Sequence, residues 1–116
     1  MKLNSNIKKI NCTGGKGAFQ GCTSLTSVLI PPSVKEIDDY SFNGCLSLTS
    51  IYIPASVTKI GQYSFEQCIS LKKIEIPYSV KLLGKGSFWG CDALEKIHIS
   101  SPIEIINSNM FYYSNH

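Results

Sequence analysis

The stretch Leu48–Leu71 reads LTSIYIPASVTKIGQYSFEQCISL, and closely similar stretches precede and follow it in the 116-residue chain. Four cysteines recur at a constant spacing of 23 residues, each with a phenylalanine three positions before it and a leucine three positions after it. The members of these series are Cys22, Cys45, Cys68 and Cys91, Phe19, Phe42, Phe65 and Phe88, and Leu25, Leu48, Leu71 and Leu94. A period between about 20 and 50 residues is typical of stacked repeat proteins, in which each unit buries its apolar face only against its neighbours. The sequence therefore predicts a repeat solenoid.

Each unit contains a short segment of alternating β-branched residues that ends at a proline, as in residues 48–53 before Pro54. This pattern predicts a short strand, and the proline ends it because it has no N–H group to donate to a neighbouring strand. Strands that return once per turn must pair in parallel, about 4.8 Å apart. The return path, for example residues 56–65, is too short for a long helix, so we expect turns and brief helical or 3₁₀ pieces there.

The chain is expected to form a single domain, because its length is within the usual range for one. Within residues 1–116 we expect an irregular part at 1–24, full repeats at about 25–47, 48–70 and 71–93, and an incomplete last repeat at 94–116. In the irregular part, Ile7 and Ile10 correspond to the pair Val34 and Ile37 of the next unit. Four extra residues follow Ile10 before the next phenylalanine, so the glycine-rich residues 11–17 should bulge outward.

The composition argues against several classes of protein. Hydrophobic residues make up 43% of the chain, which fits neither a disordered nor a membrane protein, and no stretch approaches the roughly 18 apolar residues of a membrane-spanning helix. The N-terminal residues lack the apolar segment of a secretory signal. The net charge is +3, but the lysines are scattered and arginine is absent, so nucleic-acid binding is not expected.

The repeat unit resembles the BspA-type leucine-rich repeat, whose pattern here is Leu-x-x-Ile-x-Ile-Pro-x-Ser-Val-x-x-Ile-Gly-x-x-Ser-Phe-x-x-Cys-x-Ser-Leu over about residues 19–111. The resemblance implies a right-handed α/β-type superhelix with a short-stranded parallel sheet on its concave face. It places Ser33, Ser56 and Ser79 where other leucine-rich repeats carry an asparagine that bonds to the backbone of adjacent turns. It also implies adhesion or protein binding at the surface of bacteria or parasitic protists, although a cytoplasmic location remains open because the chain shows no leader.

The strand alternation separates core positions from a face that varies between units. Leu48, Ile51 and Ile53 should point inward, while Ser50 and Tyr52 point outward. The outward residues expected to bind a ligand are Leu29, Ser50, Tyr52, Lys73, Glu75, Lys96 and His98. Exposed aromatic residues are common interface anchors, so Tyr52 is the first candidate. The alternatives are that Tyr52 and Leu29 are good strand formers packed side by side, and that the charged residues form an ordinary solvated surface.

The repeated cysteines are interpreted as small buried hydrophobic residues beside the phenylalanines. Disulfides between neighbouring turns are compatible with the expected spacing, whereas a single column of thiols does not converge on a zinc ion. Cys12 lies outside the register, in the glycine-rich segment, and is the expected reactive thiol. Asn11 begins an acceptor tripeptide for glycosylation.

The chain shows no set of residues typical of catalysis, so we expect neither an enzyme nor a bound cofactor, metal or small-molecule substrate. His98 and His116 are the two histidines, and neither is linked by sequence to a nucleophile. The residues 14–17 lack the spacing of a phosphate-binding loop. The expected partner is therefore a protein, such as a host or extracellular-matrix protein.

The C-terminal end presents apolar residues with no further turn to cover them: Met110, Phe111, Tyr112 and Tyr113. Terminal turns of solenoids need polar caps. One hypothesis is that two or more copies pair through such an end, as a homodimer or a longer array. The alternative function is accordingly an intracellular scaffold or assembly repeat.

Overall fold

The computed structural model describes residues 9–10 and 19–100, and the expected sites at Asn11, Cys12, Met110, Phe111, Tyr112 and Tyr113 lie outside them. The strands of the described residues are β1 (Lys9–Ile10), β2 (Glu36–Ile37), β3 (Ser50–Ile51), β4 (Lys59–Ile60), β5 (Lys73–Ile76), β6 (Leu82–Leu83) and β7 (Lys96–Ile99). None of the described residues is helical; turns and irregular segments connect the strands.

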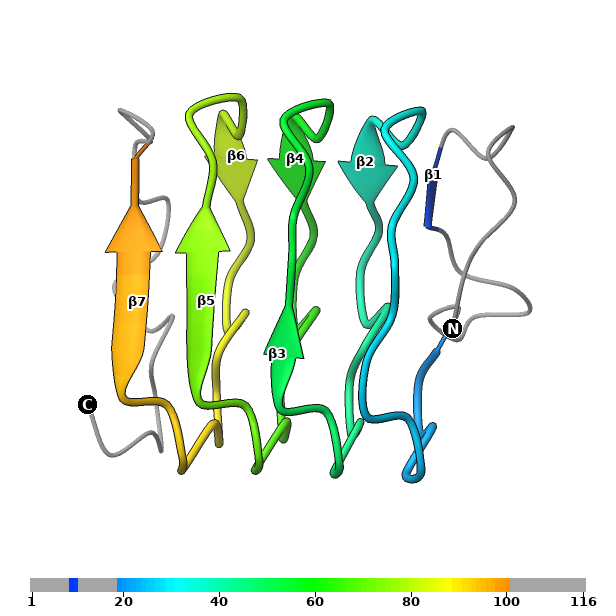
Figure 1. The fold of residues 1–116 in the computed structure, drawn as a ribbon, viewed down its shortest axis with the longest axis vertical. Coiled ribbons are helices and arrows are strands. Elements are labelled where there is room, and N and C mark those ends of the chain that lie inside the picture. Colours follow the sequence, from blue (N-terminus) through cyan, green and yellow to red (C-terminus); the bar gives the residue numbers. More distant parts are fainter. Residues whose placement is uncertain (1–8, 11–18, 101–116) are drawn as a thin grey trace.

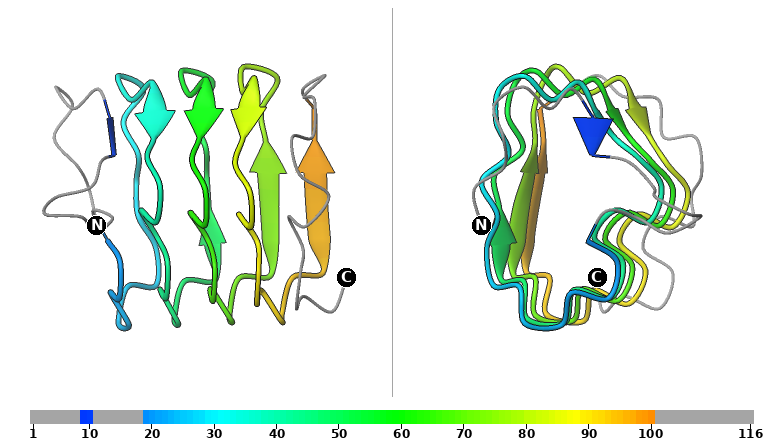
Figure 2. Two further views of the ribbon diagram at one scale, coloured as in Figure 1. Left: turned by 180° about the vertical axis from the view of Figure 1, so that it is seen from behind. Right: turned by 90° about the vertical axis from the view of Figure 1, so that its right-hand side faces the viewer.

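The strands form two parallel sheets, one in the order β3-β5-β7 and one in the order β1-β2-β4-β6. Successive turns of the chain lie side by side in Figure 1. The right-hand view of Figure 2 looks along the stack, where the turns superimpose on one outline with the two sheets on different sides. The predicted solenoid is therefore confirmed.

The β3-β5-β7 sheet has the register that the repeat predicts. Ser50 pairs with Lys73, and Lys73 pairs with Lys96. The next positions, Ile51, Ile74 and Ile97, form a second row. In β5 the side chains alternate between exposed and buried, so one face of the sheet packs on the core and the other faces solvent.

The return side carries a second sheet, which the sequence did not predict. Its strands are only two residues long, and Ile37, Ile60 and Leu83 are paired across it. We expected turns or brief helical pieces; the turns are present, but the described residues contain no helical piece. The backbone is instead bonded to the neighbouring turns, as where the Thr58 N–H group donates to the Lys35 carbonyl oxygen at 2.8 Å. These bonds satisfy the backbone without a helix.

The N-terminal strand confirms the expected insertion. Ile10 pairs with Ile37, a separation of 27 residues rather than 23. The four additional residues are therefore accommodated between Ile10 and Phe19, as the comparison of the units predicts. The path of residues 11–18 lies outside the described residues.

The core is a continuous spine of like residues from successive turns. Phe42 and Phe65 stack with ring centroids 5.4 Å apart, and Phe65 and Phe88 stack at 5.8 Å. All three side chains are fully buried. Each stacked pair adds about 0.5–1.5 kcal/mol to the free energy of unfolding beyond the burial of the rings. Because Phe42 and Phe65 each stack on their equivalents in both neighbouring turns, the spine holds the register of the sheets.

Cys45, Cys68 and Cys91 are buried in the same spine, as predicted, and Cys22 is half-buried; the three buried thiols also donate hydrogen bonds. The Cys45 thiol donates to the Phe19 carbonyl oxygen at 3.1 Å, and the Cys91 thiol donates to that of Phe65 at the same distance. Cys22, Cys45, Cys68 and Cys91 are all free thiols. The alternative of disulfides between turns is therefore not adopted at these four positions.

The serines that follow the strands stand at the asparagine position of other leucine-rich repeats. Ser56 and Ser79 have buried Oγ atoms without a hydrogen-bond partner among the described residues. These two serines therefore do not make the bond to adjacent turns that the asparagine makes in other leucine-rich repeats. The physical reason is that the backbone groups beside them already pair with each other, as in the bond from the Val57 N–H group to the Pro54 carbonyl oxygen.

Candidate functional site

The predicted outward face is the solvent-exposed face of the β3-β5-β7 sheet. All seven expected ligand-binding residues are exposed on the structure: Leu29, Ser50, Tyr52, Lys73, Glu75, Lys96 and His98. They are held there by strand alternation, because Ile51 and Ile74 turn the opposite way and are buried. The scaffold therefore presents these side chains without using them for packing.

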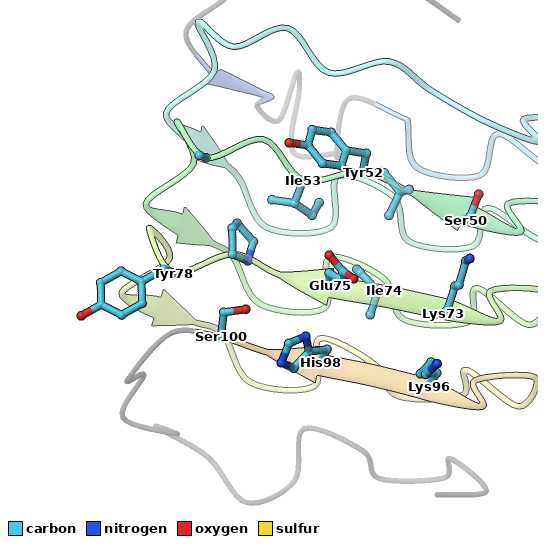
Figure 3. Close-up of a pocket in the computed structure, with 13 residues that line it drawn as sticks. Ser50, Tyr52, Ile53, Lys73, Ile74, Glu75, Tyr78, Lys96, His98 and Ser100 are labelled. Atoms are coloured by element: carbon cyan, nitrogen blue, oxygen red, sulfur yellow. The ribbon is translucent and has the colours of Figure 1, made fainter.

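A shallow groove of about 740 Å³ runs along this face. It contains all of the expected residues except Leu29: Ser50, Tyr52, Lys73, Glu75, Lys96 and His98. Figure 3 shows that these side chains come from β3, β5 and β7, with Tyr52 directly after β3. Residues that are 23 or 46 positions apart in the sequence thus form one surface.

One end of the groove is hydroxyl-bearing and cationic. Ser50, Lys73 and Lys96 occupy equivalent positions in β3, β5 and β7, and all three are exposed. They lie together in Figure 3. No carboxylate occupies this column, so this end of the groove is positively charged.

The middle of the groove carries a mixed set of side chains. Glu75 of β5 is paired with His98 of β7, and Tyr52 follows β3 in the preceding turn. Tyr52 is 66% exposed, which is unusual for a large aromatic side chain and leaves its ring available to a partner. The exposed carboxylate and imidazole provide polar contacts beside it.

The other end of the groove includes residues that the sequence reasoning missed: Ala55, Pro77, Tyr78 and Ser100. Tyr78 is 66% exposed, and the Lys81 ammonium lies 4.8 Å from the centre of its ring. Tyr78 fills the variable position of the Ile-Pro-x-Ser-Val pattern, where Pro32 and Ala55 stand in the preceding units. This position varies between units as the outward strand positions do, and that variation is the sequence signal that identifies it.

Leu29 lies apart from the groove. It is 55% exposed and forms an isolated bridge in the first described turn, where the chain does not form an extended strand. The groove lining begins one turn later, at Ser50. Leu29 therefore shares the face with Tyr52 but not the groove.

A second surface feature is a partly exposed column of aromatic rings. Tyr40 and Tyr63 stack with centroids 5.2 Å apart, and Trp89 meets Tyr63 edge-on at the same distance. Gly86 occupies the place that a third tyrosine would have in the 23-residue period. Trp89, from a different position in the repeat, covers the Tyr63 ring there. This column joins neighbouring turns of the solenoid by ring-to-ring contacts.

Metal binding and thiol reactivity can be assessed only for the residues that the structure describes. No group of three or more His, Cys, Asp or Glu side chains there is arranged to hold a metal ion. Burial raises the pKa of the Cys45 thiol to about 11 and that of the Cys91 thiol to about 12. Buried, protonated thiols are poor nucleophiles.

Comparison with known proteins identifies the fold family. A model of the BspA type leucine rich repeat region, which has six copies, matches residues 1–116. The chain belongs to the BspA-type leucine-rich repeat family. No curated protein matches this BspA-type chain.

Solved structures of bacterial leucine-rich repeat proteins are similar to it. A T. pallidum leucine-rich repeat protein is 27% identical with a TM-score of 0.72, over 85% of this chain and 56% of that one. A Eubacterium ventriosum leucine-rich repeat protein is 20% identical with a TM-score of 0.74, and the match covers 94% of this chain and 34% of that one. A leucine-rich cell surface protein of Faecalibacterium prausnitzii is 22% identical with a TM-score of 0.52, and the match covers 89% of this chain and 38% of that one. The chain thus spans about half of the first protein and about a third of the others.

The described residues of this BspA-type chain include no helix that is long and apolar enough to cross a membrane.

Proposed function

We propose that this chain is a non-catalytic module that binds a protein ligand through the groove on the β3-β5-β7 face. The observation that carries the proposal is the contrast between the two sides of each strand. The buried positions repeat from unit to unit, whereas the groove positions change. A surface that varies on a constant scaffold is suited to recognition.

In this proposal the scaffold holds the binding side chains at fixed positions. The phenylalanine spine fixes the spacing of the strands, and the strands fix the spacing of Tyr52, Glu75 and His98. A surface that is already ordered loses little conformational entropy on binding. Tyr52 and Tyr78 are the expected anchors, because exposed aromatic side chains dominate many interfaces.

The open shape of the groove supports contact rather than catalysis. Catalytic electrostatics are strongest where water is excluded. Here Lys73, Glu75 and His98 are all exposed on a flat sheet face. We therefore propose that these side chains bind a partner and do not transform a substrate.

We also propose that the protein acts at the cell surface, with a host or extracellular-matrix protein as its partner. Two observations support this location: the family to which the chain belongs, and the name of the F. prausnitzii cell surface protein that shares its fold. Protease treatment of intact producing cells tests it. Digestion of the module without lysis supports a surface location, and digestion only after lysis contradicts it.

The binding site is tested by selecting peptides from a random display library on the wild-type protein and measuring their affinity for three variants. Tyr52→Ser and Tyr78→Ser should each weaken binding by about ten-fold or more, since hot-spot side chains contribute about 2 kcal/mol. Leu82→Ser is the matched control, because it removes an exposed apolar side chain of β6, in the other sheet and outside the groove. Unchanged affinity in well-folded Tyr52→Ser and Tyr78→Ser variants would place the site elsewhere.

A further inference from the structure

The cationic end of the groove holds two like charges side by side. Lys73 and Lys96 are directly paired in neighbouring parallel strands, about 4.8 Å apart along the sheet. Like charges in such positions destabilise a sheet. Neither ammonium group forms an ion pair with the residues that the structure describes. The pair therefore has a net electrostatic cost in the free protein.

The fold does not require these lysines. The equivalent position in β3 is Ser50, and in the preceding turn it is Ser27. The side chains face solvent, so packing does not select them. A repulsive pair that packing does not demand is explained by an anionic group that binds between the two ammonium groups, with the Ser50 hydroxyl as an additional donor.

The rest of the groove restricts which anion fits. Glu75 lies on the same face, two residues along β5 from Lys73, which is about 6.6 Å at 3.3 Å per residue. Its carboxylate repels a chain that is negatively charged along its whole length, such as a nucleic acid or a sulfated polysaccharide. A peptide can instead place a carboxylate at the lysines and a neutral or basic residue beside Glu75.

The end of the groove opposite Lys73 and Lys96 places a second requirement on the ligand. Tyr52 and Tyr78 expose two-thirds of their surface; Tyr52 is level with Glu75 in the neighbouring turn, and Tyr78 lines the groove beyond Glu75. Figure 3 shows Tyr78 at the opposite end of the groove from Lys73 and Lys96. Aromatic rings in this position favour an apolar or aromatic side chain.

We propose that the ligand of this groove is an acidic, extended peptide segment of the partner protein. Its carboxylate binds between Lys73 and Lys96, and apolar or aromatic residues further along it pack on Tyr52 and on Tyr78. This inference rests on the proposed function, because it names the chemistry of the ligand for the same site.

The test uses fluorescence anisotropy with a labelled short peptide that has glutamates at one end, serines in the middle and a tyrosine at the other end. The double variant Lys73→Glu/Lys96→Glu should bind this probe about ten-fold or more weakly, because two favourable charge contacts become repulsive. The matched control is Lys35→Glu/Lys85→Glu, which changes the net charge equally at exposed positions outside the groove. It should keep most of the affinity. Glu75→Gln should bind the probe about two-fold more tightly.

Three results would overturn the inference. Equal losses in the two double variants would show that the attraction depends only on net charge. Absence of binding by the acidic probe, together with binding of the same peptide with glutamine in place of glutamate, would remove the acidic preference and leave the proposed function intact. Tight, lysine-dependent binding of a heparin oligosaccharide without binding of the peptide would assign the site to a glycan.

Discussion

The Cys68 thiol donates a hydrogen bond to the carbonyl oxygen of Phe42, 3.1 Å away and 26 residues earlier in the chain. The same oxygen accepts a bond from the Cys45 N–H group at 3.2 Å. One phenylalanine carbonyl is thus bonded both to its own turn and to the next one. The repeated cysteine therefore links neighbouring turns in addition to filling the core.

Substitution of this cysteine should show both contributions. We expect Cys68→Ala to lower the free energy of unfolding by about 1–3 kcal/mol, because it removes the thiol donor and leaves a small cavity. Urea unfolding followed by circular dichroism measures the change. Cys22→Ala is the control, since Cys22 is only half-buried. Equal losses at the two positions would contradict a specific role for the buried thiol.

The buried thiols also predict a dependence of stability on pH. Burial is the main cause that raises the pKa of Cys45 to about 11 from the ordinary value of 9.0, and burial raises the pKa of Cys68 still further. Between about pH 9 and pH 11 the unfolded chain therefore loses protons that the folded chain retains. Their contribution to the free energy of unfolding is present below pH 9 and falls as the pH rises.

The measurement is urea unfolding at several pH values under reducing conditions, on the wild type and on the triple variant Cys45→Ala/Cys68→Ala/Cys91→Ala. The wild type should lose stability more steeply above pH 9 than the variant, which lacks the titrating thiols. Parallel slopes for the two proteins would show that other groups cause the alkaline loss.

The phenylalanine spine should be the most sensitive part of the core. Phe65 stacks on both Phe42 and Phe88, so Phe65→Ala should cost about 3–5 kcal/mol of unfolding free energy. Tyr52→Ala should cost less than about 1 kcal/mol, because its side chain is exposed. Thermal and urea unfolding of both variants check the contrast. A cost at Phe65 no larger than that at Tyr52 would mean that the stack does not hold the turns together.

Two glycines allow backbone strain to be separated from steric overlap. Gly21 and Gly86 both have positive φ angles, 75° and 65°. An added Cβ at Gly21 would meet no atom within 4 Å, whereas at Gly86 it would lie 2.6 Å from the Tyr63 ring. Gly21→Ala should therefore cost about 1–2 kcal/mol from backbone strain alone, and Gly86→Ala should cost more. Equal unfolding free energies for the two variants would show that Tyr63 moves aside freely.

The sequence predicted the parts of the fold that depend on side chains repeating at a fixed period. The pairing of Ile51 with Ile74, and the stacking of Phe42 on Phe65, follow directly from the 23-residue spacing. The second sheet could not be predicted this way. Its strands, such as Lys59–Ile60, are too short for a pattern of alternation, and they form because stacked turns bring backbone groups together.

The same reasoning explains which parts of the candidate site were foreseen. Tyr52 and Lys73 were placed on the outward face because alternation within a strand determines orientation. Tyr78 was missed because it follows the strand, in a turn whose direction alternation does not determine. Trp89 was missed because it comes from another position of the repeat, so an alignment by period does not place it on Tyr63.

The most direct test of the proposed function is a chemical-shift map of the isotope-labelled protein with a peptide selected for binding. Binding through the groove predicts that the largest amide shifts occur in β3, β5, β7 and the turn at Tyr78. Shifts concentrated instead around β2, β4 and β6 would show that the ligand binds the opposite side of the solenoid and would contradict the proposed site.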